Sequence, residues 1–100
     1  LENISVVPNP YIVSSKFNED SNGNRIRFTR LPSKCRISIF TISGELVKVI
    51  EHENINNDTD SNEWWNLKNS RGRDVAPGLY IYHVETDKGL SKVGKFSIVR

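Results

Sequence analysis

Short segments rich in β-branched and aromatic residues recur along this chain, and clusters of Gly, Pro, Asn, Asp and Ser separate them. That spacing is typical of an all-β sandwich or barrel, because each segment is long enough for a strand and too short for a helix. No apolar pattern of helical period with capping residues is present. The predicted strands fall at residues 4–7, 11–13, 24–29, 35–42, 46–50, 63–67, 79–86 and 91–99.

Size and charge narrow the possible classes of protein further. One hundred residues suit a single domain, 1–100, and a hydrophobic content of 36% suits a thin sandwich better than a helical bundle. We therefore expect an immunoglobulin-like antiparallel β-sandwich of about seven strands. A net charge of +2, with cations interleaved among acids, does not indicate nucleic-acid binding. No apolar run reaches the roughly 20 residues of a membrane span. The absence of Met suggests a fragment of a larger protein.

The aromatic residues between positions 64 and 82 predict which side chains enter the core. Adjacent strand residues point to opposite faces, so one of Trp64 and Trp65 should be buried and the other should lie outside. We expect Tyr80, Tyr82 and Val84 to face inward, with a tyrosine hydroxyl anchoring a corner of the sandwich. An outward Trp also permits a carbohydrate platform, but no second aromatic residue clearly accompanies it.

The residues that usually carry chemistry form no recognisable catalytic set. Cys35 is the only cysteine, which excludes an internal disulfide and cysteine-based zinc sites, and it alternates with Ile37 and Ile39 as a buried side chain would. His52 and His83 lie in no motif and are interpreted as ordinary surface or half-buried histidines. We therefore expect a protein that is not an enzyme.

Two acidic loops are candidate calcium sites, since alternating oxygen ligands suit that cation. The first contains Asp58 and Asp60, but Glu63 stands where a glycine is needed and Asn69 where a bidentate acid is needed. The second begins at Asp20 and lacks the remaining ligands as well. We therefore predict that the chain needs no cofactor or metal. Calcium at either loop is the alternative.

Several short motifs resemble, in order and spacing, the C-terminal sorting domains of the type IX secretion system. They are Pro8-Asn9-Pro10, Ile26-Arg27-Phe28, Leu31-Pro32, the hairpin of residues 37–47, Gly78-Leu79-Tyr80, Lys92, Lys95 and the closing residues 96–100. The segment from Trp65 to Tyr82 also resembles the immunoglobulin-like domain of flagellar hook-capping proteins, which shares this architecture.

The resemblance implies a non-catalytic module that directs a larger secreted protein across the outer membrane of a Gram-negative bacterium to the cell surface. Its partner would be the outer-membrane secretion machinery or neighbouring domains of the parent protein. A structural or carbohydrate-binding accessory domain of an extracellular enzyme, or a hook-cap-like assembly module, is the alternative. The implied sorting residues are Gly78, Tyr80, Gly89, Lys92, Lys95 and Val99, with Pro8, Asn9 and Pro10 at the entry.

Overall fold

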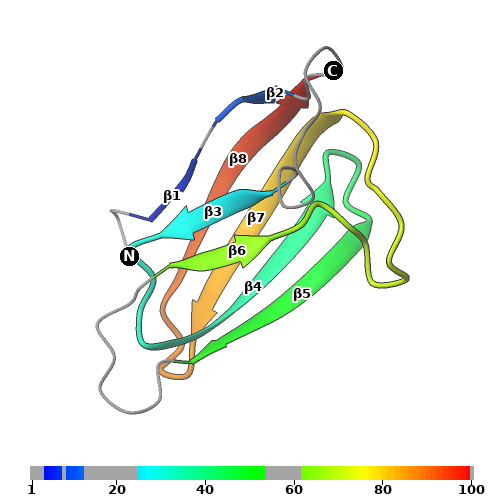
Figure 1. Cartoon of the computed structure of the whole chain (residues 1–100). Coiled ribbons are helices and arrows are strands. Elements are labelled where there is room, and N and C mark those ends of the chain that lie inside the picture. The colour runs from blue at the N-terminus through cyan, green and yellow to red at the C-terminus, as the bar shows by residue number, and fades with distance from the viewer. Residues whose placement is uncertain (1–3, 8, 13–24, 54–61, 100) are drawn as a thin grey trace.

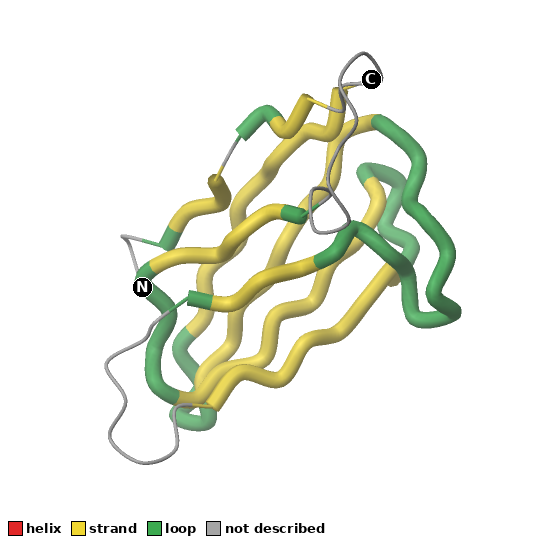
Figure 2. The backbone as a smooth tube through the Cα atoms, in the orientation of Figure 1, coloured by secondary structure: helices red, strands yellow, loops and turns green. Residues whose placement is uncertain are grey.

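The structure, a computed structural model, describes residues 4–7, 9–12, 25–53 and 62–99. These residues form eight strands and no helix (Figure 1 and Figure 2). The predicted all-β sandwich is confirmed, with eight strands instead of about seven. Accordingly, no helix in the described part is long and apolar enough to cross a membrane.

The eight strands are divided between two sheets. A three-stranded sheet has the order β1–β3–β6 and consists of β1 (Ser5–Val7), β3 (Ile26–Thr29) and β6 (Glu63–Trp65). A five-stranded sheet has the order β2–β8–β7–β4–β5 and consists of β2 (Tyr11–Ile12), β8 (Ser91–Val99), β7 (Gly78–Thr86), β4 (Lys34–Thr41) and β5 (Leu46–Glu53). Figure 1 shows the smaller sheet lying across one face of the larger one.

One strand pair departs from the antiparallel arrangement that we expected. β2 runs parallel to β8, pairing Tyr11 with Ile98 and Ile12 with Val99, whereas all other pairs of named strands are antiparallel. β1 belongs to one sheet and β2, only a few residues later, belongs to the other. There β2 pairs with β8, which lies far from it in the sequence, and no hairpin joins these two strands. The sequence contains no local turn signal for such a pairing, because a parallel pair is joined by a long connection.

The core lies between the two sheets and is built around Phe96, which is 2% exposed. Its ring contacts the rings of Phe28, Trp65, Tyr80 and Tyr82, with centroid distances between 5.6 and 6.3 Å. Aromatic pairs in these geometries add stability beyond the apolar area they bury. The expected inward set of Tyr80, Tyr82 and Val84 is confirmed, since all three side chains are buried.

β5 is longer than the sequence indicated, and His52 is the reason. We expected the strand to end at residue 50 because Glu51, His52 and Glu53 are polar. His52 is nevertheless only 5% exposed, and its Nδ1 lies 2.8 Å from Glu63 Oε1 on β6. This hydrogen bond links the two sheets and satisfies one ring nitrogen of a buried histidine. The interpretation of His52 as a surface or half-buried residue was therefore wrong.

The connection between β6 and β7 is held by specific hydrogen bonds. Asn69 Oδ1 accepts from the backbone N–H groups of Arg71 and Arg73 at 2.9 and 3.0 Å, and Gly72 adopts a φ of 80° that suits glycine. The Trp65 indole Nε1 donates to the Lys68 carbonyl at 2.9 Å. The aromatic segment of residues 64–82 is therefore a folding element that joins the two sheets.

Candidate recognition surface on the last hairpin

Tyr80 anchors the start of the last hairpin from inside the core. Its ring stacks on Phe96 at a centroid distance of 5.6 Å, and its hydroxyl donates a hydrogen bond to the carbonyl of Ala76, four residues upstream. Burial raises the pKa of the Tyr80 hydroxyl, so this group stays protonated as a donor. The expected tyrosine anchor is confirmed, and Tyr80 serves the fold and presents no surface for recognition.

The two glycines among the sorting candidates lie at opposite ends of the hairpin. Gly78 begins β7 with a φ of 151°, a conformation that residues with a Cβ rarely adopt. Gly89 lies in the turn between β7 and β8 with a φ of 86°, and its N–H donates to the Thr86 carbonyl at 3.1 Å. Because one residue starts the hairpin and the other turns it, the structure does not bring these two candidates together.

The two lysine candidates on β8 lie on opposite sides of the sheet. Lys92 is half-buried and pairs with the buried Val84, so it belongs to the inner side. Lys95 is exposed and pairs with Ile81, so it belongs to the outer side. Val99, at the end of β8, is 43% exposed and pairs with Ile12 of β2. A partner that contacts both lysines must therefore bind at the edge of β8, because only there are both faces of the five-stranded sheet accessible to one partner.

The Pro-Asn-Pro motif meets β8 at this same edge through its asparagine. Asn9 Nδ2 donates to the Lys95 carbonyl at 3.3 Å, and Asn9 Oδ1 accepts from the Ser97 N–H at 3.2 Å. The side-chain amide thus bonds to β8 as the backbone of a neighbouring strand would. Pro10 is exposed beside it, and Pro8 lies outside the described residues.

The edge of β8 before this contact has no neighbouring strand in the described part of the chain. β2 pairs only with Ile98 and Val99, and the Asn9 amide binds at Lys95 and Ser97. Within the described residues, the outward N–H and C=O groups of Ser91 and Val93 and the N–H of Lys95 are therefore available to an added strand. This arrangement can bind an extended peptide and supplies no chemistry of its own.

Gly94 is a structural residue of the hairpin that sequence reasoning missed. It pairs with Tyr82 across the ladder, and a Cβ built on it would stand 2.4 Å from Cζ of the tyrosine ring. The aromatic ring therefore lies over the glycine. A glycine at an inward position of a predicted strand, between Val93 and Lys95, was the available signal, because glycine inside a strand marks a close approach.

An open groove of about 610 Å³ lies beside the β7–β8 turn, and the sequence did not reveal it either. Both signs of charge line it: Arg30, Lys34 and Lys88 are cationic, and Glu53 and Asp87 are acidic. Since the charges nearly cancel, the groove favours no ligand class by its electrostatics.

The remaining sequence expectations concern residues away from the hairpin. Cys35 is a free, buried cysteine, as predicted, and burial together with the negative charges of Glu63 and Glu51 raises the pKa of its thiol to about 11. A thiol held neutral in this way is a poor nucleophile. The loops with Asp20, Asp58 and Asp60 lie outside the described residues, and the described residues include no group of three potential metal ligands.

Comparison with known proteins concerns the fold alone. No protein-family model and no curated protein sequence matches this chain. Among solved structures, the chain is similar to PorZ, described as an essential bacterial surface component of the type IX secretion system of Porphyromonas gingivalis, with a TM-score of 0.74 and 22% identity. The likeness covers 99% of this chain and 12% of that one, so the chain spans about an eighth of its neighbour's length. A second similar structure is CopC from Methylosinus trichosporium OB3b, with a TM-score of 0.49, 16% identity, and coverage of 95% and 89% of the two chains.

Proposed function

We propose that this domain is a non-catalytic sorting module of the type IX secretion system, which directs a larger secreted protein to the surface of a Gram-negative bacterium. The observation that carries the proposal is the open edge of β8 between Ser91 and Lys95, next to the Asn9 contact. The likeness of fold to part of a surface component of that system supports it, as does the resemblance of the ordered motifs.

In this proposal the secretion machinery recognises the domain by adding a strand to β8. Main-chain hydrogen bonds would supply affinity, and the side chains that flank the edge would supply selectivity. Lys92 and Lys95 flank that edge from its two sides, and their charge discourages pairing with the wrong strand. Gly78, Tyr80 and Gly89 hold the hairpin in shape, while Val99 ends the strand beside β2.

The proposal is tested by fusing residues 1–100 to the C-terminus of a reporter that carries an export signal, in a bacterium with this secretion system. We expect the reporter at the cell surface or in the medium, and the same reporter without the domain in the periplasm. Retention of the fusion in the periplasm would reject a sorting function.

A substitution at Val93 tests the recognition step separately. Residues 91, 93, 95 and 97 direct their N–H and C=O groups away from β7, as the Asn9 contacts with Lys95 and Ser97 show. Val93→Pro removes one donor from the open edge and leaves the ladder with β7 intact. We expect a folded domain by circular dichroism that no longer sorts, while Val93→Thr, which keeps the N–H, sorts normally. Normal sorting of the proline variant would show that this edge is not recognised.

A second function, packing against a neighbouring domain of the parent protein, is favoured by the outer face of the five-stranded sheet. Leu46, Val49, Leu79 and Val93 are all exposed there, and exposed apolar patches of this kind mark contact surfaces. The alternative predicts that the isolated domain binds the neighbouring domain in a calorimetric titration, and that Val49→Lys weakens this binding about tenfold. A titration without heat of binding would exclude it.

A further inference from the structure

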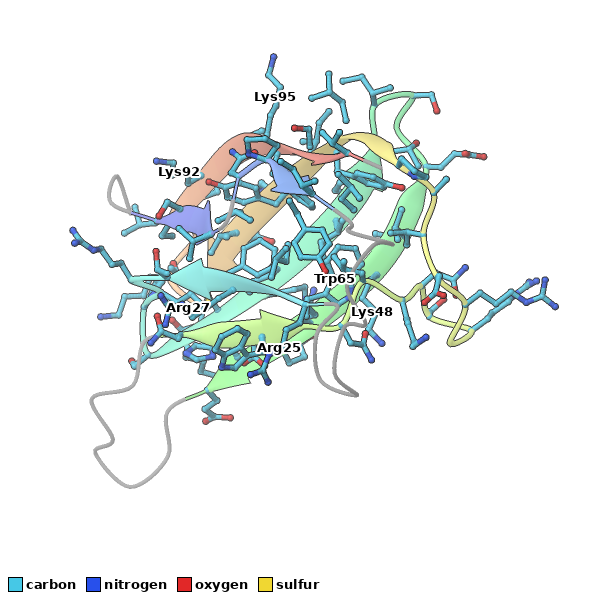
Figure 3. All side chains as sticks on the ribbon, turned by 45° about the horizontal axis from the view of Figure 1, so that its top comes forward. Arg25, Arg27, Lys48, Trp65, Lys92 and Lys95 are labelled. Carbon is cyan, nitrogen blue, oxygen red and sulfur yellow. The ribbon has the colours of Figure 1, made fainter. Side chains whose placement is uncertain are left out.

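The outer face of the three-stranded sheet carries a group of cations around one exposed tryptophan. Ile26 and Phe28 of β3 are buried, so Arg25 and Arg27 point outward, and Trp64 of β6 lies directly opposite Arg27. Figure 3 shows Arg25, Arg27 and Lys48 on this side of the molecule, away from Lys92 and Lys95. We refer to Arg25, Arg27, Arg30, Lys48 and Trp64 as the cationic face.

The two arginines are held against the indole ring of Trp64. The guanidinium carbon of Arg25 lies 4.1 Å from the ring centroid, and that of Arg27 lies 5.4 Å away. Both distances fall within the range of a cation–π interaction. An arginine stacked in this way loses little further freedom when it binds a carboxylate. The Nε of Arg27 is buried without a hydrogen-bond partner, so its terminal nitrogens are the donors that a carboxylate would meet. With guanidinium groups against the ring, the indole is poorly placed to stack on a sugar.

Among the described residues that line the grooves at the cationic face, cations lie without compensating acids. Two open grooves of about 400 and 460 Å³ lie at this face, one beside Arg25 and Lys48 and the other beside Arg27 and Arg30. Within the described residues that line these grooves, four are cationic and none is acidic. The described cations elsewhere include Arg36, which pairs with Glu51 at 2.8 Å. Two guanidinium groups on one ring repel each other, and a bound anion removes that repulsion.

We propose that the cationic face binds an acidic, extended segment of a partner protein in which carboxylates recur at every second residue. Arg25 and Arg27 lie two residues apart on one face of the chain, which corresponds to a spacing of about 6.6–6.8 Å in a strand. Carboxylates at alternate positions of an extended peptide repeat at that distance, and each guanidinium matches one carboxylate with two hydrogen bonds. Arg and Trp are also the residues that dominate the binding energy of protein interfaces.

This inference does not depend on the sorting function. Apart from Lys48, the cationic face belongs to the three-stranded sheet and the residues that adjoin it, whereas the β8 edge belongs to the five-stranded sheet. Lys48 lies on β5, at the opposite side of the five-stranded sheet from β8. Failure of one proposal therefore leaves the other standing.

The test is a calorimetric titration of the 100-residue chain with a ten-residue peptide in which glutamate and threonine alternate. We expect binding that weakens as sodium chloride is raised, since the pairing is between charges near the surface. Arg25→Gln and Arg27→Gln should each weaken binding about tenfold, whereas Arg36→Gln, a matched change on the other sheet, should leave it within twofold. Trp64→Phe, which keeps an aromatic ring, should weaken binding less than Trp64→Leu.

Several outcomes overturn the proposal. A peptide in which glutamine replaces glutamate must not bind, and equal binding of that peptide would show that the carboxylates are not recognised. Equal or tighter binding of polygalacturonate, which carries carboxylates on a sugar chain, or of oligothymidylate would assign the face to another class of polymer. An equal loss of affinity with Arg36→Gln would show that net charge alone is measured.

Discussion

Gly94 offers the sharpest test of how the last hairpin is packed. It lies opposite Tyr82 in the β7–β8 ladder, and a Cβ at this position would stand 2.4 Å from Cζ and Oη of the tyrosine and 2.6 Å from Cε2. Contacts this short do not persist in folded proteins, so Gly94→Ala must displace either the ring or the strand.

The ring of Tyr82 has little room to move. It is 4% exposed, it meets Phe28 edge-on at a centroid distance of 5.6 Å, and it packs against Phe96 at 6.3 Å. We therefore expect Gly94→Ala to destabilise the domain by about 1–3 kcal/mol, the usual cost of overpacking. The reduced freedom of alanine in the unfolded chain offsets this by no more than about 0.4–1 kcal/mol.

Guanidinium denaturation followed by circular dichroism measures this cost in two backgrounds. Tyr82→Leu removes the two ring carbons and the hydroxyl oxygen that the new Cβ would touch, so Gly94→Ala should be close to neutral in that background. The coupling energy between the two sites should then be about 1–3 kcal/mol. The same cost in both backgrounds would show that the ring does not lie over Gly94, and the reasoning would be refuted.

Five further substitutions probe the core, the outer face of β6 and the β8 edge. Trp65→Ala, at a buried side chain that is 2% exposed, should cost about 3–5 kcal/mol in chemical denaturation, whereas Trp64→Ala should cost less than about 1 kcal/mol. Tyr80→Phe should cost about 0.5–1.5 kcal/mol through loss of the hydrogen bond to the carbonyl of residue 76; no measurable change would argue against that bond. Asn9→Ala should cost about 1 kcal/mol and should increase exchange of the Ser97 amide hydrogen with solvent. Because the pKa of the Cys35 thiol is raised to about 11, the unfolded chain ionises first as pH rises, so stability is lost above about pH 9. The difference between the wild type and Cys35→Ala should change by about 1.4 kcal/mol between pH 8 and pH 10, and a constant difference would contradict the shift.

The pattern of alternation predicted the inner faces correctly because each strand is half-buried. Ile37 and Ile39 point inward from β4, and Phe28 points inward from β3. All three side chains are completely buried. The adjacent tryptophans divide between the two faces as strand geometry requires, with Trp65 inside and Trp64 outside. In each case the information is local, since one residue's neighbours in sequence determine which face it shares.

The features that the sequence did not reveal depend on residues that are distant along the chain. His52 can be buried because its Nδ1 is hydrogen-bonded to Glu63 Oε1 of the opposite sheet. No residue near position 52 in the sequence indicates that partner. The contact of Asn9 with Lys95 and Ser97 joins residues more than eighty positions apart. Contacts of this kind appear only when the sheets are assembled, so strand patterns predict the layers and leave the links between them undetermined.

The position of Asn9 also explains why the edge of β8 is open in one part and closed in another. An amide side chain reaches only two backbone groups, Lys95 C=O and Ser97 N–H, and β2 adds a pair of residues beyond them. A strand in the place of this motif would pair along the whole of β8 and leave no site for a partner. Because proline cannot donate to a ladder, the prolines around Asn9 oppose such an extension. The motif thus closes the end of β8, and among the residues that the structure describes it leaves the outward groups of Ser91 and Val93 and the Lys95 N–H open, which is the geometry that strand addition requires.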